Sequence, residues 1–62
     1  MDNKMEVRKY VKDLVFDTIM DLDLDWIIEN VIDVGLISEV DEDMEETGNI
    51  IWEEFRNILN GK

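Results

Sequence analysis

The chain has 62 residues, a formal net charge of −11, and no Cys, His or Pro. A chain of this length buries only about 60% of the surface that it exposes when unfolded, so we expect one marginally stable domain. The absence of Cys excludes disulfides and thiolate metal sites, and the acidity argues against direct contact with nucleic acid or an anionic membrane.

The first predicted helix covers residues 3–21. Asn3 and Glu6 have the spacing of a capping box, in which two side chains satisfy free backbone amides at a helix start. Phe16 and Met20 fall on the face opposite the apolar stripe. That inward stripe consists of residues at helical spacing: Val7, Tyr10, Val11, Leu14, Val15, Thr18 and Leu22.

The second predicted helix begins at Asp23, whose carboxylate can cap the first free amides, and ends at Gly35, a residue suited to the left-handed conformation that terminates helices. Its inward stripe is Leu24, Ile27, Ile28, Val31 and Val34. Its outward face carries Asp25, Glu29 and Asp33, with Trp26 beside them.

The third predicted helix runs from Ser38, with Asp41 three residues later, to about Asn60, just before Gly61. Gly48 disfavours helix by about 1 kcal/mol relative to Ala, so a kink or a break is expected there. If this helix is continuous, Ile50 projects onto the acidic arc. The inward stripe is Val40, Met44, Thr47, Ile51, Phe55 and Ile58, and the opposite acidic arc is Glu39, Glu42, Asp43, Glu45, Glu46, Glu53 and Glu54. Three amphipathic helices with short connections predict an all-α three-helix bundle.

Carboxylates recur at every fourth position six times running: Asp13, Asp17, Asp21, Asp25, Glu29 and Asp33. Like charges four residues apart oppose helix formation by about 0.2–0.5 kcal/mol per pair. Residues 13–55 as a whole carry fifteen carboxylates and no Lys or Arg, whereas four of the six basic residues lie in the first twelve positions. A turn near residues 21–24 would reset the helical phase and keep these acids on one side of the bundle.

Enzyme and cofactor chemistry finds little support in these residues. Without His or Cys the chain lacks the commonest general base and the commonest soft nucleophile, so we expect no enzyme and no cofactor. The stretch DLDLD places Asp21, Asp23 and Asp25 at the first three ligand positions of a calcium-binding EF-hand loop, but the glycine position is Trp26 and the bidentate glutamate position is Ile32. We therefore expect no dedicated metal site.

The sequence also argues against a DNA-binding helix-turn-helix protein and a membrane protein. If residues 23–60 formed a helix-turn-helix, the recognition helix would begin with SEVDEDMEE. The negative charge of that stretch is opposite to the charge of the Lys and Arg residues that bind phosphates. The N-terminus, MDNKMEVRKY, is polar, and no apolar run approaches the ~18 residues of a membrane span. A cytoplasmic protein is expected.

The density of acids gives the leading functional hypothesis. Glu39 to Glu54 spans about 24 Å of helix at ~1.5 Å per residue and carries eight carboxylates, a spacing close to that of phosphates along a DNA strand. In size, acidity and helical content the chain resembles the DNA-mimic inhibitors of bacteriophages, among them anti-restriction and anti-CRISPR proteins. That resemblance implies a stoichiometric inhibitor, acting in the cytoplasm of a bacterial host, that blocks a basic DNA- or RNA-binding protein such as a defence nuclease.

The candidate partner-binding residues are Asp13, Asp17, Asp21, Asp25, Glu29, Asp33, Glu39, Glu42, Asp43, Glu45, Glu46, Glu53 and Glu54. The alternative is an acidic immunity protein, an antitoxin or a regulatory module that binds its partner through an apolar helix face. Candidates for that contact, or for the seam of a homodimer, are Phe16, Met20, Trp26, Ile50 and Trp52. For the acidic faces the competing interpretation is a solvated surface that keeps the chain soluble, and for the two Trp residues it is the edge of the core.

Overall fold

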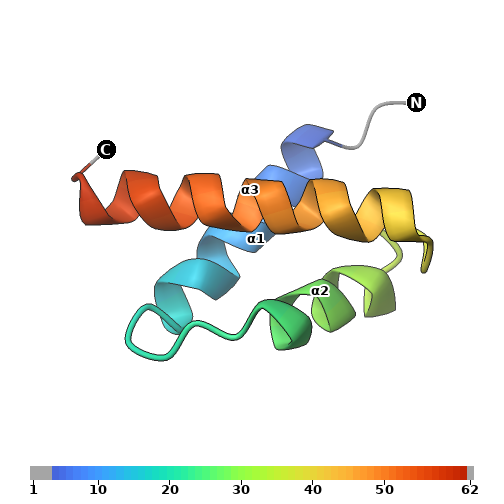
Figure 1. Cartoon of the computed structure of the whole chain (residues 1–62), viewed down its shortest axis with the longest axis horizontal. Helices are drawn as coiled ribbons and strands as arrows, with labels where there is room; N and C mark the ends of the chain where they lie inside the picture. Colours follow the sequence, from blue (N-terminus) through green and yellow to red (C-terminus); the bar gives the residue numbers. More distant parts are fainter. Residues whose placement is uncertain (1–3, 62) are drawn as a thin grey trace.

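The computed structural model describes residues 4–61, which form three helices and no strand: α1 (Lys4–Asp17), α2 (Leu24–Asp33) and α3 (Asp41–Leu59). In Figure 1, α3 lies across α1, and the turn after α1 leads into α2, which runs back beneath α3. The most extensive helix contacts are between α1 and α3, and α2 packs against both. The molecule measures 30 × 22 × 17 Å. The prediction of an all-α three-helix bundle is confirmed.

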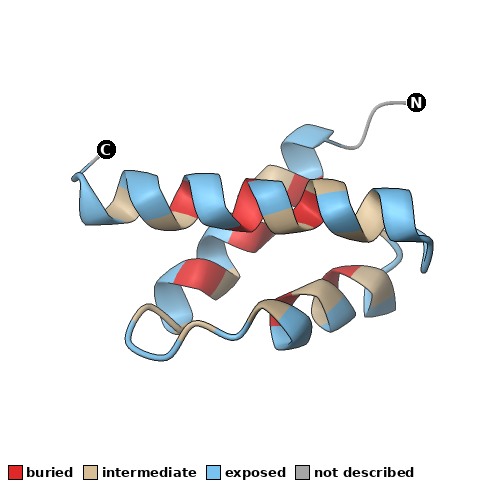
Figure 2. Cartoon of the chain, in the orientation of Figure 1, coloured by how far each residue is buried: buried red, intermediate tan, exposed pale blue. Residues whose placement is uncertain are grey.

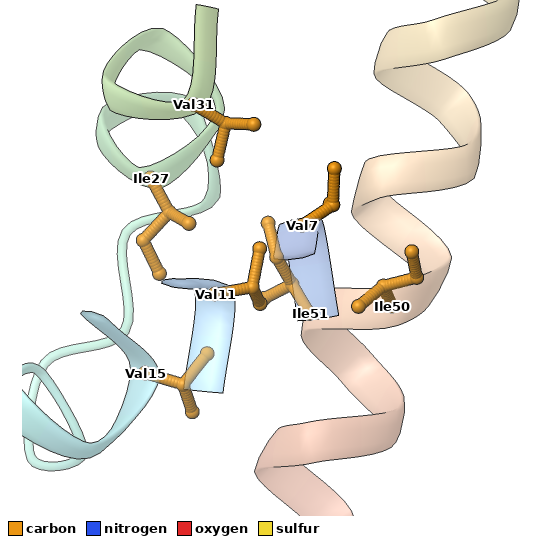
Figure 3. Packing of buried hydrophobic residues seen from close by; sticks show 7 residues of the cluster. All are labelled: Val7, Val11, Val15, Ile27, Val31, Ile50 and Ile51. Carbon is orange, nitrogen blue, oxygen red and sulfur yellow. The ribbon is translucent and has the colours of Figure 1, made fainter. Parts of the chain in front are cut away.

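The core is built almost entirely from β-branched side chains. Three valines at four-residue spacing on α1 meet isoleucines and a valine from α2 and α3 where the helices cross (Figures 2 and 3). Branched side chains have few rotamers, so ordering them in a core loses little conformational entropy. The buried apolar cluster is Val7, Val11, Val15, Ile27, Val31, Ile50 and Ile51.

Helix α1 ends at Asp17, four residues before the predicted end. Beyond Asp17 the backbone forms tighter turns than an α-helix. The amide of Ile19 donates to the Phe16 carbonyl and the amide of Asp21 donates to the Thr18 carbonyl, so each hydrogen bond spans three residues instead of four. The Thr18 hydroxyl also donates to the Leu14 carbonyl at 2.8 Å, a local bond that competes with regular helix. Asn3, the predicted first residue of the capping box, lies outside the described residues.

Helix α2 has the predicted ends. The Asp23 carboxylate accepts a hydrogen bond from the Trp26 amide at 3.1 Å, which satisfies one of the free amides of the first turn. Gly35 adopts φ +80° just past the helix, and the amides of Gly35 and Leu36 bond back to Ile32 and Val31. This pair of hydrogen bonds is the Schellman motif, in which a residue in the left-handed conformation lets the chain turn away from the helix axis. The inward placement of Val34 was wrong, because the residue caps α2 and is exposed.

Helix α3 begins at Asp41, after Val40 in extended conformation, and not at Ser38. No side chain caps the Val40 position; instead the Asp43 carboxylate accepts a hydrogen bond from the Ser38 amide at 3.0 Å. Val40 is exposed, which corrects its inward placement. The helix runs unbroken through Gly48, so the expected interruption does not occur (Figure 1). The end before Gly61, which has φ +75°, is as predicted.

Candidate functional site

The six acids at four-residue spacing are all exposed. Asp13 and Asp17 lie on α1, Asp21 lies in the turn that follows, and the other three lie on α2. Within residues 4–61 none of the six takes part in an ion pair. The turn at residues 18–23 interrupts the series, so the like charges are divided between two separate helices rather than stacked along one.

A groove brings two of these acids together with a third from the following loop. Asp25 and Glu29 stand one helical turn apart on α2, and Glu39 comes from the segment that leads into α3. The groove has a volume of about 550 Å³. Its lining is Asp25, Ile28, Glu29, Ile32, Glu39 and Met44, so that three carboxylates stand beside three large apolar side chains. Asp33, on the last turn of α2, is exposed but does not line the groove.

A second group of acids lies on the first half of α3. Glu42, Glu45 and Glu46 line a depression together with Asn49. Glu46 is partly neutralised, because its Oε1 lies 3.0 Å from Nζ of Lys4. The net charge of this group is therefore smaller than its residue types suggest, and the groove along α2 carries the more concentrated unpaired charge.

Glu54 does not belong to an open acidic surface, and the exposed Glu53 beside it is paired with a cation. Nη1 of Arg8 lies 2.9 Å from Oε2 of Glu54 and 3.4 Å from Oε1 of Glu53. Glu54 is only 6% exposed, so its assignment to the outward arc was wrong. The hydrogen bond to Glu54 holds the pKa of the Arg8 guanidinium above its usual value. These contacts cross from α1 to α3 and make the three residues part of the structure of the bundle.

A structural role for Arg8 was not predicted from the sequence, although the spacing of the residues around it indicates one. Arg8 lies at helical spacing from Val11 and Val15, beside the buried stripe, and Glu54 lies at helical spacing from Ile50 and Ile51. A cation and an anion that each border an apolar stripe are placed to meet when the stripes pack.

The apolar candidates divide into two groups. Phe16 and Met20 are 65% and 95% exposed, as predicted from their position opposite the core. Ile50 is only 5% exposed and belongs to the core cluster, so its placement on the acidic arc was wrong. Trp26 and Trp52 are partly exposed, and Trp52 packs edge-on against Phe55 with ring centroids 5.8 Å apart.

Outside the groove along α2, the described part of the chain has few features of a small-molecule or metal site. The cavity beside Lys4 and Val7 has a volume of about 180 Å³, below the ~300–1,000 Å³ typical of ligand pockets. No three carboxylates within residues 4–61 converge as metal ligands would. None of the helices described has the length and apolar content to cross a membrane.

Comparison with protein-family models, with curated proteins and with solved structures finds no match. The features that stand out are the unpaired carboxylates of α1 and α2, the groove between Asp25 and Met44, and the exposed pair Phe16 and Met20.

Proposed function

We propose that this chain is a stoichiometric inhibitor that occupies the nucleic-acid-binding surface of a basic partner protein, such as a bacterial defence nuclease. The observation that supports the proposal is the distribution of charge. Residues 13–55 carry fifteen carboxylates without a single base, and in the described structure only Glu46, Glu53 and Glu54 among them form ion pairs. Among residues 4–61 the other twelve have no ion-pair partner, and most of them are exposed.

Electrostatics explains why a basic partner would respond to such a surface. Exposed like charges raise the free energy of the isolated protein, and a cationic surface relieves that repulsion on binding. Complementary charge also raises the rate of encounter, and salt weakens the effect by screening. Short Asp side chains on α1 and α2 hold their charge close to a helical backbone, so less side-chain entropy is lost on docking.

A second candidate is a protein-binding module that acts through apolar contacts, as an immunity protein, an antitoxin or a regulator. The exposure of Phe16 and Met20 favours it, because large apolar side chains are common anchors in interfaces. The same two residues would form the seam of a homodimer. The two candidates predict opposite responses to salt, since screening acts on charge and not on apolar burial.

The test is capture of partners from a bacterial lysate on the immobilised protein at low and high salt. We expect basic nucleic-acid-binding proteins to be retained at low salt, released at high salt, and displaced by duplex DNA that competes for the same surface. The triple charge reversal Asp25→Lys, Glu29→Lys and Asp33→Lys should abolish their retention. These positions are exposed and outside the core, so the fold should survive.

Phe16→Ser and Met20→Ser provide the matched controls, because both positions are exposed and neither substitution changes the net charge. Retention that survives the charge reversals, or that is lost in these two variants and insensitive to salt, would rule out the electrostatic inhibitor. The second result would support the apolar module.

A further inference from the structure

The groove along α2 has an apolar floor that the chain itself does not cover. Ile28 packs in part against the core cluster. Ile32 and Met44 are half-buried, yet in residues 4–61 they belong neither to that cluster nor to the side chains packed against it. With a volume of about 550 Å³, the groove can take several side chains of a partner.

The rim of the groove determines which partner chemistry fits. Asp25 and Glu29 stand on the α2 side and Glu39 on the side of the loop, and all three are exposed. No base lies among the lining residues, and no base occurs anywhere in residues 13–55. An apolar segment alone would leave these carboxylates partly desolvated without a partner, whereas Lys or Arg beside the apolar residues would pair with them.

The geometry favours a helix over an extended strand as the occupant. The wall formed by α2 has its backbone hydrogen bonds closed within the helix, so it offers no edge to which a strand could bond. A helix satisfies its own backbone and can lie along α2. Asp25 and Glu29, like Ile28 and Ile32, are separated by about 6 Å along the axis, and a partner helix repeats its side chains at the same spacing.

We propose that this groove binds a basic amphipathic helix of the partner, with a central row of Leu or Ile between flanking Lys or Arg. The proposal rests on the proposed function in that it identifies how the basic partner is held. It adds an apolar contact to a complex that would otherwise depend on charge alone. Specificity then comes from the floor of the groove, and the rate of encounter comes from the rim.

A second copy of the chain is the competing occupant. The outer face of α1 carries Lys9 and Lys12 between the exposed Met5 and Phe16, a stripe of the same general chemistry. However, each copy brings a net charge of −11, so self-association works against strong mutual repulsion. A foreign basic helix meets no such opposition.

The test uses synthetic helical peptides of about 18 residues, long enough to hold helical structure. The first peptide has a row of Leu flanked by Lys on both sides. In the second, Gln replaces Leu; in the third, Gln replaces Lys. Titration is followed by amide chemical shifts of the folded protein, and we expect only the first peptide to bind tightly and to shift residues 25–32 and 39–44.

Substitutions in the groove distinguish the contribution of its apolar floor to binding from that of its acidic rim. Ile32→Ser should weaken the first peptide by about tenfold or more, because a buried apolar contact is lost. Glu29→Lys should weaken it by about tenfold, whereas Asp17→Lys, an equal charge reversal on α1, should change affinity by less than about threefold. If Ile32→Ser fails to fold by circular dichroism, Met44→Gln tests the same floor.

Three results would overturn the groove proposal: equal binding of the Gln-for-Leu peptide, shifts that map outside the groove, or a homodimer in sedimentation that Ile32→Ser dissolves. The last would make a second copy the occupant. If the peptides fail but lysate capture remains sensitive to salt and to charge reversal, the groove proposal fails and the inhibitor stands. If the first peptide binds but capture is insensitive to salt, the inhibitor fails.

Discussion

Replacing Arg8 by Met removes the guanidinium that joins α1 to α3 and leaves Glu54 buried without its cation. The Glu54 side chain is 8% exposed, whereas that of Arg8 is 44% exposed, so water can reach the cation but hardly the carboxylate. A hydrogen bond to a charged group contributes about 1.5–3 kcal/mol. The contact with the exposed Glu53, at 3.4 Å, adds little.

We therefore expect Arg8→Met to lower the free energy of unfolding by about 2 kcal/mol. A domain of this size has about 3–9 kcal/mol of stability in total, so the loss is a large share. It corresponds to a fall of about 8–16 °C in Tm. Urea unfolding at neutral pH, followed by circular dichroism, should show a lower midpoint with an unchanged slope.

Lys12→Met is the matched control, because it removes the same charge from an exposed position on the same helix and should change stability by less than about 0.5 kcal/mol. The double variant Arg8→Met, Glu54→Met should recover most of the loss, since no buried charge then remains unpaired. Equal losses in Arg8→Met and Lys12→Met, or no recovery in the double variant, would refute a structural role for the pair.

Three further substitutions test the local reasoning. Asp23→Ala removes the cap of α2 and should cost about 1 kcal/mol in urea unfolding, whereas Asp21→Ala, which changes the net charge equally in the preceding turn, should be nearly neutral; similar losses would contradict the capping role. Gly48→Ala should stabilise by up to about 1 kcal/mol, because a Cβ there meets nothing within 4 Å and Ala favours helix; a lower Tm would show that the position needs Gly. Ile51→Ala should destabilise by about 2–5 kcal/mol through a cavity in the core, against little change for Leu59→Ala on the exposed end of α3, and comparable midpoints for the two would be inconsistent with the core described.

Helix ends that depend on nearby residues could be read from the sequence. Asp23, Gly35 and Gly61 act on amides and carbonyls within a few residues, so their roles follow from local chemistry alone. The predicted start at Ser38 was wrong: the helix begins at Asp41, and the Ser38 amide donates a hydrogen bond to the Asp43 carboxylate in the turn that precedes it. The helical period also predicted correctly that the side chains of Asp25 and Glu29 are exposed.

The candidate site was predictable only in part. Periodicity marked the exposed acids of α2, but it could not show that the loop returns Glu39 and Met44 to the same groove, because that depends on the path of residues 34–40 between two packed helices. The groove therefore exists only at the tertiary level.

The sequence by itself determined three amphipathic helices, their strongest caps and an acidic exterior, because each of these follows from neighbours within one or two helical turns. The tertiary structure decided how far each helix is rotated toward its neighbours. Crossing α1, helix α3 turns Ile50 and Glu54 inward, and the carboxylate of Glu54 is tolerated there only because Arg8 reaches it from the other helix. The type of a residue suggests whether its side chain is buried or exposed. The cation that stabilises the buried carboxylate of Glu54, however, lies 46 positions away along the chain.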